Sequence, residues 1–282
     1  MSYDLFFNTD SGRTIDKKSF ATYFGERANY KVAKGQAVYQ NDNTGVYFIF
    51  DEPSDSVVAF NLNFHRPHVF GLEAAVELET FAGAFGGLSA IDPQDDQSDG
   101  EPAAFDRERF LRAWNAGNAF AYRAMLKEQT EPPHTWPARR IRQVWDWNYA
   151  RAAEQARDEN VFLPAIFAMN VGGEVQSVAI WPPDCPILMP EVDALLAPVA
   201  QQGRHSKQLA MVPWNQVQPV VKPYQEKGAG LARYRLAFEA WPAEVAAFLA
   251  AKRAQMTGVE GIPWDQVLDR EMVEEAGGGG SR

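Results

Sequence analysis

The sequence has a single cysteine, Cys185, so no disulfide can form within the chain. Nowhere do about 18 apolar residues follow one another, as a transmembrane helix requires. The first residues lack the basic segment and long apolar run of a secretory signal. We therefore expect no membrane partner. A reducing compartment fits these features, although a cysteine-poor exported protein would look the same.

Positive charge is also scarce. The 27 Lys and Arg residues are outnumbered by 37 Asp and Glu residues, which gives a formal net charge of −10. Nucleic acid is a poor partner for such a chain, because phosphate binding needs a basic face. A basic protein is a better candidate, although the acidity could simply keep the protein soluble.

Half of the net charge lies in residues 92–101 (DPQDDQSDGE), which contain no Lys or Arg. We expect residues 86–104 to form a loop or mobile linker. Its carboxylates are the candidate partner-binding residues: Asp92, Asp95, Asp96, Asp99 and Glu101.

No catalytic signature is present. The sequence has no G-x-S-x-G elbow and no glycine-rich phosphate loop, and Cys185 stands in a proline-rich turn without basic neighbours. His65 and His68 are the nearest histidine pair, but Pro67 between them indicates a turn and no third ligand is near. We expect a structural corner there, no metal, no cofactor and no enzyme activity. A hydrolase that uses His65 or His68 is the alternative.

What the sequence does contain is a strong pattern of strands and helices. Residues 3–8 and 36–41 read as strands, and residues 17–25 as a short helix. Residues 46–50 are apolar on both faces of a strand, and residues 57–64 alternate apolar and polar side chains. Residues 72–85 switch to helical spacing. Glutamates on this helix are expected to reach solvent: Glu73, Glu77 and Glu79.

Asp106 is the expected N-cap of a helix over residues 107–127, which is followed by a helix over 139–157. The second half repeats a similar order of elements. We expect strands at 161–170, 174–181, 208–214 and 231–238, and helices at 190–200 and 243–254.

These elements predict an α+β fold with two lobes of mainly antiparallel sheet, helices packed on them, and central helices that bridge the lobes. The expected lobes are residues 1–130 and 131–275. Residues 276–282 have the composition of a flexible tail.

Residues 44–50 (TGVYFIF) and 60–81 (FNLNFHRPHVFGLEAAVELETF), followed by FLRAWNAGN at 110–118, resemble the bacterial immunity protein 52 family. The resemblance covers mainly residues 1–125 and rests on structural motifs. The family is associated with restriction-endonuclease-fold nuclease toxins of polymorphic and type VI secretion systems.

The resemblance implies a cytoplasmic protein that neutralises a cognate antibacterial toxin by stoichiometric binding. An acidic surface that includes residues 92–101 would be drawn toward the basic DNA-binding cleft of such a toxin. Blocking could also occur outside the active site, for example by preventing toxin oligomerisation. An effector chaperone or adaptor is the alternative within this class, and the oligomeric state is open.

Overall fold

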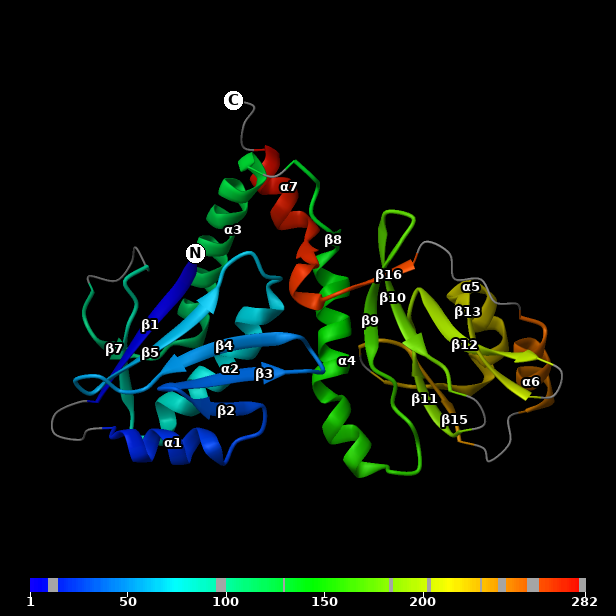
Figure 1. The fold of residues 1–282 in the computed structure, drawn as a ribbon, viewed down its shortest axis with the longest axis horizontal. Coiled ribbons are helices and arrows are strands. Elements are labelled where there is room, and N and C mark those ends of the chain that lie inside the picture. Colours follow the sequence, from blue (N-terminus) through cyan, green and yellow to red (C-terminus); the bar gives the residue numbers. More distant parts are fainter. Residues whose placement is uncertain are drawn as a thin grey trace. The chain divides into compact units, whose positions relative to one another are not determined.

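The computed structural model describes residues 1–9, 15–94, 100–128, 130–182, 185–201, 204–228, 230–237, 242–252 and 259–278. The chain divides into two compact units (Figure 1). The first unit contains Met1–Ala138 together with Leu268–Arg282, and the second contains Arg139–Val267. The predicted α+β class with mainly antiparallel sheets is confirmed.

The first unit is built on a seven-stranded antiparallel sheet. Four of its strands, β1, β3, β4 and β5, alternate buried residues with more exposed ones, as expected for a sheet with one covered face. The spatial order is β2 (Tyr30–Ala33), β3 (Gln36–Asn41), β4 (Val46–Asp51), β5 (Val57–Asn63), β1 (Ser2–Thr9), β6 (Leu88–Ile91) and β7 (Ala103–Ala104).

Three helices cover one face of this sheet, and aromatic side chains form the core between the two layers. Phe81 of the second helix lies 5.3 Å from Phe7 and 5.0 Å from Phe50, measured between ring centroids. Phe110 of the third helix lies 5.5 Å from Tyr3. The helices are α1 (Lys17–Gly25), α2 (Val69–Ala84) and α3 (Arg107–Glu128).

Two glycines let α2 and α3 approach their neighbours closely. A Cβ on Gly71 would lie 2.7 Å from Cε3 of the fully buried Trp114. A Cβ on Gly117 would lie 2.7 Å from Cζ of Phe64. Such distances are well inside van der Waals contact, so neither position admits a larger residue without displacing the core.

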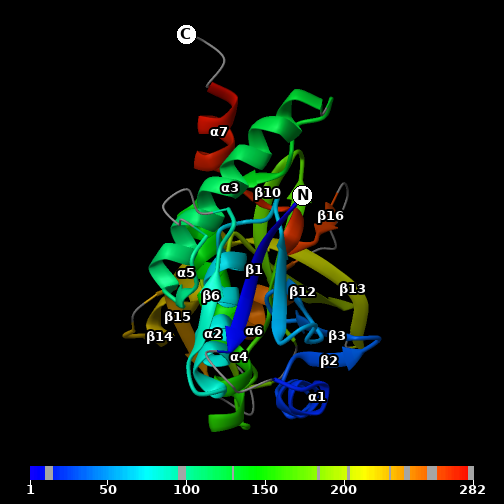
Figure 2. The same cartoon turned by 90° about the vertical axis from the view of Figure 1, so that its left-hand side faces the viewer.

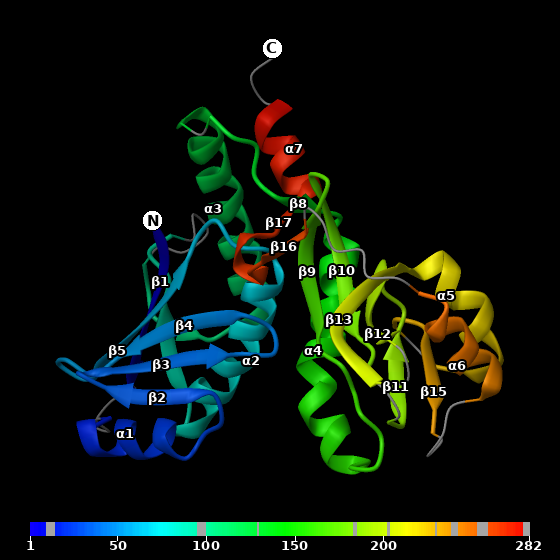
Figure 3. The same ribbon diagram turned by 45° about the vertical axis from the view of Figure 1, so that its right-hand side comes forward.

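The C-terminal segment returns to the first unit. β17 (Leu268–Asp269) pairs in parallel with β8 (Thr135–Trp136), and α7 (Arg270–Gly278) then runs beside α3 (Figures 2 and 3). Asp269 is buried and accepts hydrogen bonds from the backbone N and the Nδ1 of His68, both at 2.6 Å.

This return differs from the expected lobes. Residues 268–275 were expected in the lobe of 131–275, but they pack with the first unit, because the strand pairing and Asp269 fix them there. Residues 276–278 of the expected tail belong to α7, and the rest of that prediction, residues 279–282, lies outside the described part of the chain.

The second unit contains a five-stranded sheet and a three-stranded sheet. In the larger sheet β10 and β12 are parallel and the other pairs are antiparallel. Its order is β13 (Arg204–Pro213), β12 (Ala194–Gln201), β10 (Glu174–Ile180), β9 (Ile166–Val171) and β16 (Val259–Ile262). The smaller sheet has the order β11 (Ile187–Pro190), β15 (Arg233–Leu236) and β14 (Gln225–Glu226).

A long helix packs on the larger sheet. Asn148 on this helix bonds both the N–H and the C=O of Ile166, each at 2.9 Å. The predicted helix at 139–157 is thus confirmed. The helices of this unit are α4 (Ala138–Arg157), α5 (Trp214–Val221) and α6 (Ala243–Ala250), with short 3₁₀ turns at η1 (Lys222–Tyr224) and η2 (Trp264–Gln266).

Two predicted elements are wrong. The helix expected at 190–200 is strand, most of it β12, where residues 194–197 are all buried. A short apolar run that is buried on both faces has no period to distinguish it from a helix. The loop expected at 86–104 contains β6 and β7, because residues 88–91 pair with β1.

The expected solvent exposure of Glu73 is also wrong, since its side chain is fully buried. Its Oε1 accepts hydrogen bonds from the Tyr39 hydroxyl at 2.7 Å, Asn41 Nδ2 at 2.8 Å and Thr44 Oγ1 at 3.2 Å. Burial and the nearby Glu73 carboxylate raise the pKa of Tyr39. Glu73 therefore ties α2 to the turn that precedes β4.

Candidate functional site

The predicted partner-binding carboxylates fall on both sides of a gap in the described chain. Asp92 lies directly after β6, and Glu101 lies two residues before the start of β7. Asp95, Asp96 and Asp99 lie outside the described residues. The structure therefore places two of the five.

Hydrogen bonds fix residues 92–94 along β1. The hydroxyl of Tyr3 donates a hydrogen bond to Asp92, and the backbone N of Gln94 donates to Asp92 Oδ1 at 3.0 Å. The Gln94 side chain bonds β1 at two points, the N–H of Asp4 at 2.8 Å and the C=O of Ser2 at 3.0 Å. The carboxylate of Asp92 thus has a defined position at the edge of the sheet.

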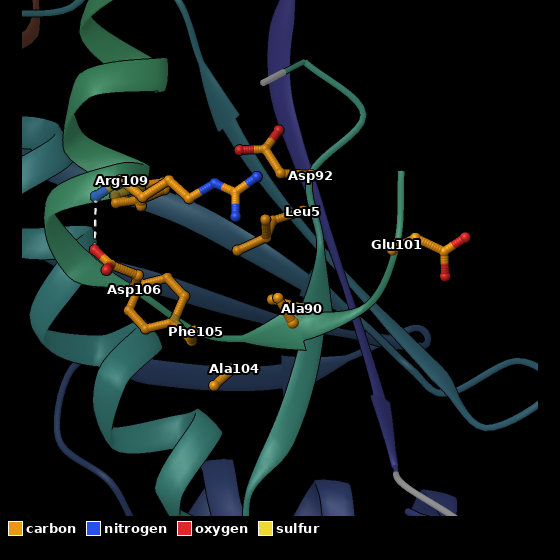
Figure 4. Close-up of a pocket in the computed structure, with 10 residues that line it drawn as sticks. Leu5, Ala90, Asp92, Glu101, Ala104, Phe105, Asp106 and Arg109 are labelled. Atoms are coloured by element: carbon orange, nitrogen blue, oxygen red, sulfur yellow. Dashed lines mark hydrogen bonds between the residues drawn. The ribbon is translucent and has the colours of Figure 1, made fainter. Parts of the chain in front are cut away.

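Asp92 and Glu101 both line a hollow in front of α3 (Figure 4). Figure 4 shows the Arg109 side chain reaching toward Asp92, while the Glu101 carboxylate points away from Arg109. Asp106 begins α3 as predicted, because its Oδ1 accepts from the backbone N of Arg109 at 2.8 Å. The hollow encloses about 30 Å³. This is room for a few water molecules at most, far below the size of a small-molecule site.

Further carboxylates lie on the side of the first sheet that faces away from α1, α2 and α3. We call this side the outer face. Its residues are half-exposed, and they alternate with the buried core residues along each strand. The outer face includes Asp4, Phe6, Gln36, Val38, Ile49, Asp51, Ala59, Asn61 and Ile91.

Two carboxylates of the outer face are held by amide side chains of neighbouring strands. Asn61 Nδ2 donates to Asp4 Oδ1 at 2.5 Å, and Gln36 Nε2 donates to Asp51 Oδ1 at 2.9 Å. Neither aspartate stands out in the sequence, because only the strand order, with β1 between β5 and β6, brings them onto one face. Aspartate at an outward position of an alternating strand was the available signal.

The corner at residues 65–68 is held by α3. His65 has a positive φ of 62°, and its Nε2 lies 3.0 Å from the C=O of Ala121. Asn118 accepts from the backbone N of His65 and donates to the C=O of Arg66, at 2.8 and 2.7 Å. Tyr122 also donates to the C=O of Arg66, at 2.6 Å. These contacts support the prediction that the corner is structural.

His68 is the second histidine of this corner, and its two bonds to Asp269 hold the C-terminal segment. Within the described ranges, no group of three or more His, Cys, Asp and Glu residues is arranged to hold a metal ion.

The second unit has a larger hollow, of about 110 Å³, between α4 and the start of β15. Its walls carry charges of both signs. Arg233 Nη1 lies 3.4 Å from Glu154 Oε2, and Arg235 Nη1 lies 2.9 Å from Asp158 Oδ2. The hydrogen bonds that Arg235 donates to the carboxylates of Glu226 and Asp158 raise its pKa. Arg233 and Glu154, which both line the hollow, therefore pair with each other.

Comparison with protein-family models, with curated proteins and with solved structures gives no match in any of the three. Among the helices of the described residues, none combines the length and the apolar character that a membrane span would need.

Proposed function

We propose that the protein is an immunity protein that binds and neutralises a basic nuclease toxin of a type VI secretion system, as a stoichiometric inhibitor in the cytoplasm. The observation that supports this proposal best is the set of fixed carboxylates on one sheet. Asp4, Asp51 and Asp92 each accept a hydrogen bond that holds the side chain in place. The resemblance of residues 44–118 to an immunity-protein family points the same way.

Fixed carboxylates favour binding for two reasons. Their rotamers are already restricted, so less conformational entropy is lost when a partner binds. Their charge is part of a net charge of −10, which accelerates encounter with a basic surface.

The area that tight inhibition requires also favours a rigid face. Stable inhibitor complexes bury on the order of 1,600 Å² in total, around a few well-packed anchors. The acidic segment at 92–101 is too short to supply that area alone. In the proposed complex the sheet therefore supplies most of the contact area.

The test takes as the candidate toxin a neighbouring-gene product that has DNase activity. The purified proteins are mixed and the complex is measured by calorimetry, and the DNase activity of the complex is then compared with that of the free toxin. We expect a one-to-one complex, loss of DNase activity and protection of cells that express both genes. A complex with full DNase activity would identify a chaperone instead. Absence of both binding and protection would refute the proposal.

A further inference from the structure

The outer face of the first sheet has the composition of a protein-binding surface, with an apolar middle and acidic positions beside it. Its opposite face is covered by helices, through contacts such as those of Phe81 with Phe7 and Phe50. On the outer side the strands present half-exposed residues of mixed character. Sheet faces that meet only water are usually polar, so the apolar residues on this face need another explanation.

The strand register arranges these residues in two neighbouring rows. Asp4 lies opposite Asn61, Asn61 opposite Ile49, and Ile49 opposite Val38. This first row crosses four strands, a width of about 15 Å at the usual strand spacing of about 4.8 Å. It begins at a carboxylate and continues into two aliphatic side chains.

The second row also combines apolar side chains with a carboxylate. Phe6 lies opposite Ala59 and also opposite Ile91. Farther along the sheet Asp51 lies opposite Gln36. Each row thus joins apolar side chains to a fixed carboxylate. Protein interfaces have this composition, with an apolar core and charged groups at the rim.

The charge of the face is uneven. Its two fixed carboxylates lie on β1, which carries Asp4, and at the end of β4, which carries Asp51. Lys31 on the edge strand β2 lies opposite Val38 and contributes a positive charge at the other side. A partner that complements this pattern places its Lys and Arg side chains over β1, β5 and β4, and leaves β2 uncovered.

We infer that the outer face is the docking surface for the toxin, and that it takes a positively charged surface of the nuclease that also presents apolar side chains. The basic groups reach Asp4 and Asp51, and the apolar groups cover Phe6 and Ile49. This inference rests on the proposed function.

The experiment measures association and dissociation rates with the neighbouring-gene toxin, inactivated in its nuclease site. The first variant is Asp4→Lys/Asp51→Lys. We expect association to slow at least tenfold at low salt, and the difference to shrink at high salt as screening increases. The matched control is Glu159→Lys/Glu174→Lys, which makes the same charge change at exposed positions of the second unit. We expect the control to stay within threefold of the wild type.

A second variant, Phe6→Ala/Ile49→Ala, tests the apolar part. We expect its complex to dissociate at least tenfold faster, because loss of buried anchors appears mainly in the dissociation rate. Circular dichroism verifies folding of each variant. If the lysine variant does not fold, Asp4→Asn/Asp51→Asn replaces it, with a smaller slowing of association expected in the same direction.

Hydrogen exchange of the complex adds a readout that needs no variant. Protection confined to residues 2–9, 46–51 and 57–63 supports the inference. If the wild type binds and protects, but the outer-face variants bind equally well, only the docking surface is wrong. If the wild type does not bind the toxin, the proposed function fails and the inference fails with it.

Discussion

Glu73 offers the sharpest test of how the first unit holds together. In Glu73→Ala, three buried donors lose their shared acceptor: the Tyr39 hydroxyl, Asn41 Nδ2 and Thr44 Oγ1. A buried polar group without a partner costs about 1–3 kcal/mol, which for three groups gives an upper limit of about 9 kcal/mol. The adjacent turn is open to water at Asp42, which is exposed. We therefore expect a loss of about 3–5 kcal/mol in the free energy of unfolding.

Two further variants on α2 separate the loss of these hydrogen bonds from the loss of a glutamate side chain in general. Glu73→Gln keeps an acceptor oxygen, so we expect a loss of only about 1–2 kcal/mol. Glu79→Ala removes a side chain that is 62% exposed and whose Oε2 lies 3.5 Å from Arg107. We expect this exposed change to cost no more than about 0.5 kcal/mol.

The assay must report on the first unit alone, because a two-unit chain need not unfold in one step. Hydrogen exchange of the amides of residues 36–51 reports on the first unit alone. The N–H of Gly45 bonds the C=O of Asn41 at 2.8 Å, and its exchange should accelerate strongly in Glu73→Ala. If Glu73→Ala and Glu79→Ala are equally stable, the hydrogen bonds of Glu73 do not support the turn and the reasoning is wrong.

Two more predictions concern packing and pH. Gly117→Ala brings a Cβ to 2.7 Å from Phe64 and should cost about 1–3 kcal/mol in urea unfolding. The control Gly83→Ala meets no atom within 4 Å and should stabilise the protein by up to about 1 kcal/mol. The backbone N–H of Ala138 holds the pKa of Glu271 below its usual 4.5. A lowered carboxyl pKa stabilises above the unfolded value, and this stability is lost as pH falls through the folded pKa. The protection of α7 amides, taken relative to the intrinsic exchange rate at each pH, should therefore fall below about pH 4.5. Glu271→Gln should remove that part of the pH dependence. A wild-type profile in the variant would contradict the assignment.

The parts of the fold that the sequence predicts are those set by local pattern. Residues 46–51 and 57–63 form β4 and β5 as predicted, and alternation in the sequence specifies which side chains of β5 are buried. In β4, where both faces are apolar, the structure buries Val46, Phe48 and Phe50 and leaves the other face half-exposed. Asp106 caps α3 because its signal is contained within one turn. Where neighbours along the chain decide the structure, the prediction is confirmed.

The parts that the sequence does not predict depend on distant segments. Glu73 has the local appearance of a solvent-facing helix residue, and its burial follows from donors about thirty residues earlier in the chain. The strand β12 looks helical because both of its faces are covered. Asp4 and Asp51 become neighbours of one apolar surface only through the strand order. The candidate docking surface could therefore not be read from spacing along the chain.

The return of residues 268–278 to the first unit makes the second unit an insertion within the first. The chain leaves the first unit just after β8 and re-enters it at β17, and these two strands are paired. During synthesis, residues 139–267 emerge before the segment that supplies Asp269 to His68. The inserted unit can begin to fold while its host still lacks β17 and α7. The host is completed only after the insertion has left the ribosome, which links the order of synthesis to the order of assembly.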